Sequence, residues 1–110
     1  MLAVAVAGPT AGQTVEGSYR RNGTDRMIVR LVERGLLAVH IETTGEAGHS
    51  CEVDERLELR GTSAHFSDLE NAARDWSIVF VADGAFISYV GTHLWYCGVP
   101  ANFRGEWRRE

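Results

Sequence analysis

Residues 76–90 read Trp76-Ser-Ile-Val-Phe-Val-Ala-Asp-Gly-Ala-Phe-Ile-Ser-Tyr-Val90, and this stretch decides the class of fold. Large apolar side chains recur at every second position from Trp76 to Phe80, which places them on one face of a strand over residues 76–82. Asp83-Gly84 is a dipeptide typical of two-residue hairpin turns, so the chain is predicted to return as a second strand over residues 85–90. The stretch therefore predicts an antiparallel hairpin with one apolar face.

The rest of the chain repeats this pattern of short alternating runs separated by turn residues. In residues 36–43, Leu37, Val39 and Ile41 share one face of a predicted strand. Residues 67–75 are acidic and poorly periodic, which indicates a loop or one or two helical turns. Further strands are predicted over residues 15–21, 26–33, 49–54, 57–61 (with a possible continuation to 66) and 103–109.

About eight short strands with short connections indicate an all-β antiparallel meander. Such a meander removes its exposed edges by closing into a small barrel, and a two-sheet sandwich is the alternative. Residues 17–21 and 105–109 share the pattern Gly-x-aromatic-Arg-Arg. We therefore expect the first and last strands to pair and to close the barrel.

Length, composition and charge narrow the class of protein. The chain has 110 residues, of which 45% are hydrophobic, as expected for one globular domain. All 11 basic residues are arginine and the net charge is −4, which argues against a nucleic-acid partner. No apolar run is long enough for a membrane-spanning helix.

The N-terminal residues differ from the rest because they are small and apolar, with no charge before Glu16. Residues 1–13 resemble the distal half of a secretory signal, and a frayed tail or a first strand is the alternative. We therefore expect residues 14–110 to form the domain and the protein to be periplasmic or secreted. Cys51 and Cys97 are predicted to form a disulfide in that compartment, and two buried free thiols are the alternative.

No catalytic or metal-binding motif is present. The four histidines, His40, His49, His65 and His93, are not at metal-ligand spacing, and the common serine-nucleophile and phosphate-loop patterns are absent. The acidic pair Asp54-Glu55 is predicted to lie in a solvated turn, where a raised carboxyl pKa is not expected. We therefore predict a non-enzymatic protein without a cofactor or metal.

Arginines and aromatic residues supply the predicted binding site. Trp95 and Tyr96 are adjacent, so in a strand their rings face opposite ways and one ring needs a partner or a cover. Pairing of the terminal strands would gather arginines and two rings on one wall, where guanidinium groups suit an acidic protein surface, a phosphate or a lipid headgroup. The alternative is that these arginines cover apolar surface and pair with nearby glutamates. The predicted partner-binding residues are Tyr19, Arg20, Arg21, Trp95, Arg104, Trp107 and Arg108.

Several short segments together support a family resemblance. They are Gly17-Ser18-Tyr19-Arg20, residues 49–53, Asp83-Gly84, Tyr96-Cys97-Gly98 and residues 103–108. In this order they resemble small exported bacterial β-barrel domains, a group that includes periplasmic lysozyme inhibitors. The resemblance implies a barrel fold and a protein partner such as a lysozyme. The chain has no Ser-Gly-containing inhibitory loop of the better-known inhibitor families, so no inhibitory residues are carried over.

The expected function is that of an exported, non-enzymatic binding protein of the cell envelope that inhibits a lysozyme or another hydrolase. An acidic barrel would be steered toward a basic lysozyme. The alternative function is a carrier that holds a small apolar ligand inside the barrel. The carrier requires an open interior, whereas surface binding allows inward side chains to fill it. The predicted inward residues are Val29, Leu31, Val39, Ile41, Ile78 and Phe80.

Overall fold

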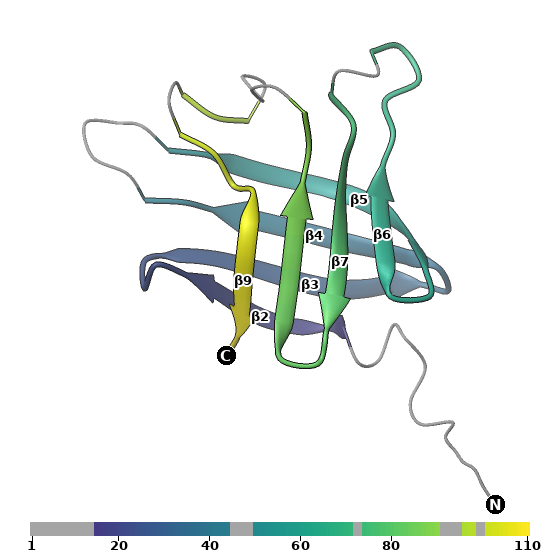
Figure 1. Ribbon diagram of the computed structural model, residues 1–110. Helices are drawn as coiled ribbons and strands as arrows, with labels where there is room; N and C mark the ends of the chain where they lie inside the picture. Colours follow the sequence, from purple (N-terminus) through teal and green to yellow (C-terminus); the bar gives the residue numbers. More distant parts are fainter. Residues whose placement is uncertain (1–14, 45–49, 72–73, 91–95, 99–100) are drawn as a thin grey trace, which may run out of the picture.

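The fold is a closed barrel of eight antiparallel strands in sequence order, as predicted (Figure 1). The computed structural model describes residues 15–44, 50–71, 74–90, 96–98 and 101–110. The predicted signal-like tail and Trp95 lie outside the described residues. Among the described residues no helix is long and apolar enough to cross a membrane. The strands are β2 (Gly17–Arg21), β3 (Asp25–Glu33), β4 (Leu36–Glu42), β5 (Glu52–Arg60), β6 (Ser63–Phe66), β7 (Trp76–Val81), β8 (Gly84–Ser88) and β9 (Gly105–Arg109).

The first and last strands close the barrel, which confirms the prediction from their shared sequence pattern. β2 and β9 are antiparallel, with Tyr19 opposite Arg109 and Arg20 opposite Arg108. β9 also pairs with β8, so every strand has two neighbours and the sheet has no free edge strand.

The middle of the chain differs from the prediction. One strand, β5, runs through Glu52–Arg60 where two separate strands were expected, and Asp54-Glu55 is not a turn. The predicted continuation of the fifth strand to Phe66 is also wrong, because the chain turns at Gly61 and returns as β6. The physical reason is that Asp54 and Arg56 point outward into solvent, whereas Glu55, on the other face of the strand, is half-buried and accepts a hydrogen bond from the Tyr96 hydroxyl. A run of three polar residues therefore remains extended.

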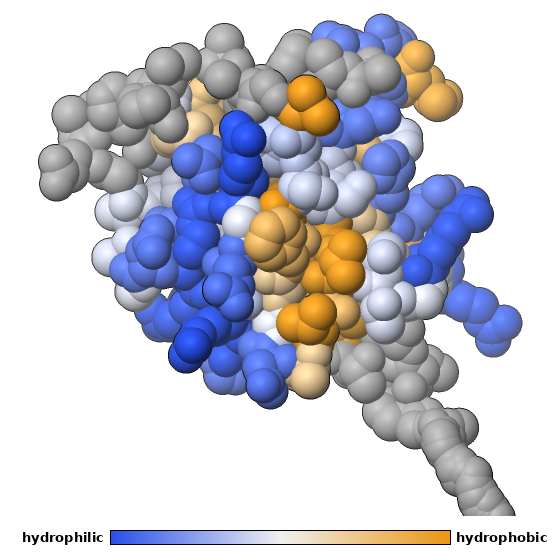
Figure 2. Space-filling model, viewed as in Figure 1, coloured by the Kyte–Doolittle hydropathy of each residue, from blue (hydrophilic) through white to orange (hydrophobic). Residues whose placement is uncertain are grey.

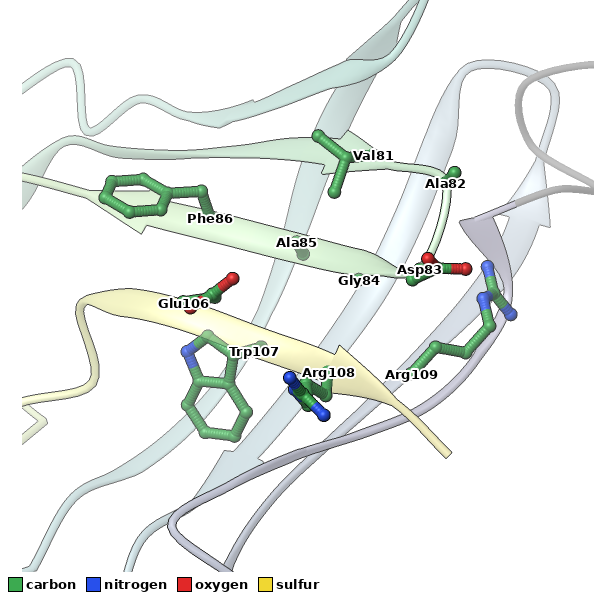
Figure 3. Close-up of a pocket in the computed structure, with 10 residues that line it drawn as sticks. All are labelled: Val81, Ala82, Asp83, Gly84, Ala85, Phe86, Glu106, Trp107, Arg108 and Arg109. Carbon is green, nitrogen blue, oxygen red and sulfur yellow. The ribbon is translucent and has the colours of Figure 1, made fainter.

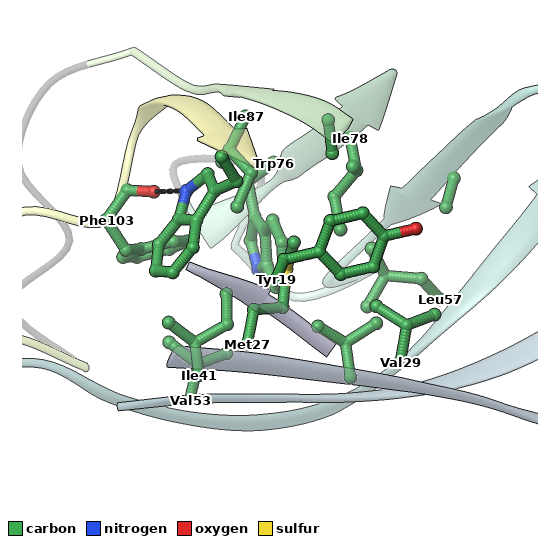
Figure 4. Close-up of a cluster of buried hydrophobic side chains, with 14 of the residues drawn as sticks. Tyr19, Met27, Val29, Ile41, Val53, Leu57, Trp76, Ile78, Ile87 and Phe103 are labelled. Carbon is green, nitrogen blue, oxygen red and sulfur yellow. Dashed lines mark hydrogen bonds between the residues drawn. The ribbon is translucent and has the colours of Figure 1, made fainter. Parts of the chain in front are cut away.

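The barrel interior is packed with side chains from all sides (Figure 4). Of the six predicted inward residues, five are buried, and Leu31 is partly buried and packed against them. Four further large rings fill the remaining space. The indole N–H of Trp107 donates a hydrogen bond to the carbonyl oxygen of Phe103 at 3.0 Å. The four rings belong to Tyr19, Trp76, Phe103 and Trp107.

A disulfide joins Cys51 to Cys97, as predicted. The two residues form an isolated antiparallel bridge just before β5, and both are buried. Backbone hydrogen bonds flank the disulfide: the N–H of Glu52 donates to Tyr96 O at 2.8 Å, and the N–H of Gly98 donates to Ser50 O at 3.0 Å. The disulfide therefore fastens the segment that contains Tyr96 to the start of β5.

A candidate binding surface on β7, β8 and β9

The two predicted rings at the junction of the terminal strands lie inside the barrel. The exposed fraction is 0% for Tyr19 and 1% for Trp107. Each ring supports an arginine: Cζ of Arg109 lies 5.1 Å from the Tyr19 ring centroid, and Cζ of Arg21 lies 5.0 Å from that of Trp107. The rings therefore pack the core and hold guanidinium groups in place, and we do not assign them a partner contact.

Arg21 is occupied by contacts within the protein. Its Nε donates to Asp25 Oδ2 at 2.8 Å, and its two terminal nitrogens donate to the carbonyl oxygens of Arg104 at 2.6 Å and Asn102 at 2.7 Å. These bonds tie the end of β2 to the segment that leads into β9. Arg21 thus fits the alternative interpretation, in which arginines cover apolar surface and stabilise the fold.

The three other predicted arginines are exposed on the outside of the barrel. Arg20 forms an ion pair with Glu110, and Cζ of Arg104 lies 4.6 Å from the Tyr89 ring centroid. Arg108 lines a groove on the outer face. Of the four predicted arginines, Arg108 is therefore the one that lines this groove.

Apolar side chains project outward beside Arg108. Val79 and Phe86 face each other across β7 and β8, and Val81 follows in the next outward position. Their exposed fractions are 43%, 54% and 60%, respectively. We call these three residues the apolar strip. Figure 2 shows hydrophobic atoms gathered over β7 and β8, with hydrophilic atoms on both sides.

The apolar strip borders a shallow groove of about 760 Å³. Figure 3 shows Val81, Phe86 and Glu106 on the outer side of the sheet, with Arg108 further along β9. Glu106 lies directly opposite Phe86 in the register of β8 and β9. The groove therefore combines apolar side chains with two acidic residues, Asp83 and Glu106, and two arginines, Arg108 and Arg109.

The apolar strip was not predicted, although the sequence contains a signal for it. Alternation in residues 76–82 assigned Trp76, Ile78 and Phe80 to the interior, which left Val79 and Val81 on the outside. Outward positions of a half-buried strand are normally polar. Apolar residues on both faces of β7 were therefore an indication of a contact surface.

A half-buried polar cluster surrounds Tyr96. The Tyr96 hydroxyl donates to Glu55 Oε2 at 2.7 Å, and Arg74 lies 3.8 Å from the same oxygen. Arg74 Nη1 also donates to Asp68 Oδ2 at 2.9 Å. This cluster connects β5 to the loop before β7 and to the segment next to Cys97.

Burial and the hydrogen bond to Glu55 raise the pKa of Tyr96 to about 12. For Arg74, burial opposes the charged form, but Tyr96, Asp68 and Glu55 outweigh this effect and raise the pKa of the guanidinium. Both groups thus keep their protons at neutral pH. The cluster is suited to holding the loop in place rather than to transferring protons.

We expect this cluster to make the protein less stable in alkaline solution. An ordinary tyrosine pKa is 10.0, whereas Tyr96 keeps its proton to about 12 in the fold. Between these two values the unfolded state binds fewer protons than the folded state, so the free energy of unfolding falls as pH rises. Burial raises the pKa of Tyr19 too, so a Tyr96→Phe variant should show a smaller loss, not none. Urea unfolding at several alkaline pH values measures this, and an unchanged pH slope in the variant would contradict it.

Two other groups of side chains contain residue types that occur in catalytic or metal-binding sites. Ser77 Oγ lies 2.7 Å from His65 Nδ1, but the Asp75 carboxylate is 4.0 Å from His65 Nε2, and the groove beside the apolar strip includes none of the three. The half-buried His40 and the exposed Glu42 and Glu52 form a group whose ligand-type atoms all lie within 4.8 Å of one another. Exposed donors of this kind do not by themselves indicate a bound ion. The predicted absence of catalytic and metal-binding residues stays a prediction.

No family model, curated protein or solved structure matches this chain.

Proposed function

We propose that the protein is an exported, non-enzymatic binding protein that engages another protein of the bacterial cell envelope through the outer face of β7, β8 and β9. The observation that carries this proposal is the apolar strip of Val79, Val81 and Phe86, exposed beside a groove that Arg108 borders. A group of exposed apolar side chains with a polar border is typical of protein interfaces.

The side chains of the groove indicate which groups the contact surface of the partner should carry. An apolar side chain of the partner would cover the ring of Phe86, and a carboxylate would pair with the guanidinium of Arg108. The net charge of −4 acts over a longer distance and favours the approach of a basic protein. A basic lysozyme that carries a local carboxylate meets both conditions, and inhibition of a lysozyme is the most specific form of the proposal.

The packing of the interior favours surface binding over the carrier alternative. A barrel of about eight strands is just wide enough for its own side chains or for one small ligand. Here the four large rings, the Phe80 ring and the aliphatic side chains of the core are buried in that space. A ligand inside the barrel would have to displace buried rings, whereas the outer groove is already open.

A panel of lysozyme types tests the specific form of the proposal. Inhibition would be measured at about 0.15 M salt, where screening limits nonspecific attraction between opposite charges. Tight inhibition of one type would support the proposal and identify the partner. Inhibition of none would remove lysozymes as the partner.

We expect a Val79→Ser variant to bind the inhibited lysozyme about fivefold more weakly, because it loses part of the apolar contact. Val32→Ser is a matched control, because Val32 is also an exposed strand valine, with 42% exposed against 43% for Val79, but it lies on β3. Calorimetric titration measures both affinities, and thermal unfolding checks that both variants fold. Equal affinities for the two variants would contradict the placement of the interface.

A further inference from the structure

A second feature of the outer surface lies on β3, β4 and β5. In the register of these strands, Arg30 is opposite Ala38, and Ala38 is opposite Arg56. Neighbouring strands are about 4.8 Å apart, so the two arginine backbones are about 10 Å apart with a single methyl group between them. Two long cationic side chains therefore stand on either side of a low point in the surface.

This low point is part of a groove of about 640 Å³. Arg30 and Arg56 are both exposed, and Ala38 is half-buried between them. The groove does not include any residue of the apolar strip. Its lining consists of Arg30, Ala38, Asp54, Glu55, Arg56 and Phe66.

Neither Arg30 nor Arg56 forms an ion pair or a side-chain hydrogen bond with another residue in the described part of the chain, whereas Arg21 and Arg74 do. Glu55, which lines the same groove, accepts the Tyr96 hydroxyl and faces Arg74. Two guanidinium groups are therefore available to a ligand in the groove.

We propose that Arg30 and Arg56 form a binding site for a phosphate monoester group above Ala38. A guanidinium group presents a planar fork of N–H donors that matches the oxygens of a phosphate. Two such groups match the charge of a phosphate monoester, which is about −1.5 to −2 near neutral pH, whereas one carboxylate needs a single arginine. The small side chain of Ala38 leaves room for the phosphate oxygens between the two forks.

Asp54 opposes binding, because its carboxylate lines the same groove. It occupies the next outward position of β5, opposite His40. Its negative charge should therefore limit the affinity of the site for an anion, and removing that charge should increase the affinity. This expectation gives the proposal a test by gain of binding as well as by loss.

The site is independent of the proposed function, because it lies on different strands and uses different residues. Failure to bind a lysozyme would leave it unaffected. Its own failure would likewise leave the interface on β7, β8 and β9 unaffected.

Nuclear magnetic resonance titration of the full chain with phenyl phosphate, at constant ionic strength set with sodium chloride, tests the site. We expect saturable shifts on β3, β4 and β5, and about tenfold weaker binding for Arg30→Gln and for Arg56→Gln. Arg34→Gln is the matched control, because Arg34 is an exposed arginine in the turn after β3 and does not line the groove. Asp54→Asn should bind more tightly than the unchanged protein.

Shifts that do not saturate would overturn the proposal. An equal loss of affinity in Arg34→Gln and Arg30→Gln would also overturn it, because that result indicates general charge attraction. The source of the phosphate is tested with phosphatidylcholine vesicles with and without phosphatidic acid. If the protein sediments with vesicles that contain phosphatidic acid but not with vesicles that lack it, the site is assigned to a lipid headgroup. If the protein binds phenyl phosphate but sediments with neither kind of vesicle, the site is assigned to a soluble phosphate ester.

Discussion

A Gly84→Ala substitution is expected to destabilise the protein by about 3 kcal/mol or more, because the added methyl group would collide with the backbone of β9. A Cβ at position 84 would lie 2.1 Å from the carbonyl oxygen of Trp107 and 3.3 Å from Cα of Arg108. Backbone atoms in a paired strand cannot move aside as the end of a flexible side chain can. β8 would have to separate from β9, and β9 is the strand that closes the barrel.

Equilibrium unfolding in urea measures this effect, and Gly61→Ala is the control. A Cβ at Gly61 would meet nothing within 4 Å, but its φ of +61° is unfavourable for alanine. The control should therefore lose only about 1–2 kcal/mol from backbone strain. Comparable losses in the two variants would show that β8 and β9 are not packed as closely as described.

Removal of the disulfide is expected to have the other large effect on stability. Cys51 and Cys97 are 46 residues apart, and closing a loop of that length restricts the unfolded chain by an amount worth about 4 kcal/mol in the chain-entropy model. The folded state also depends on this link, because it fastens the segment that contains Tyr96 to the start of β5. A Cys51→Ala, Cys97→Ala double variant should therefore unfold at a much lower urea concentration.

A reducing agent provides the internal control for this measurement. The unchanged protein should lose about the same stability in a strong thiol reductant as the double variant loses by substitution, because both lack the same covalent link. The double variant itself should not respond to the reductant. A reductant-insensitive unchanged protein would indicate that the two thiols are not joined.

Local sequence patterns predicted the terminal pairing of the barrel but not the role of the residues that carry the pattern. The repeated Gly-x-aromatic-Arg-Arg motif placed Tyr19 on the strand that pairs with β9, as found. It could not indicate that the Tyr19 and Trp107 rings both face inward and leave the exposed roles to Arg20 and Arg108. The side of a strand that faces the interior depends on how the whole sheet closes, and the motif has an arginine on each side of the strand.

Polar residues in the middle of β5 show a second limit of local patterns. The run Asp54-Glu55-Arg56 has the composition of a turn, yet all three residues are extended. Glu55 is half-buried within the strand because Tyr96 and Arg74, from two distant segments, supply its partners. No window of neighbouring residues contains that information.

The sequence by itself determined the all-β meander, the inward faces of β4 and β7, and the pair of cysteines available for a disulfide. These features follow from alternation, turn dipeptides and composition, which act between neighbouring residues. Only the tertiary structure decided which arginines are occupied and which are available, where the apolar strip lies, and that Ala38 separates Arg30 from Arg56. The reason is that cross-strand register brings together residues far apart in the chain, and that register is set by closure of the barrel.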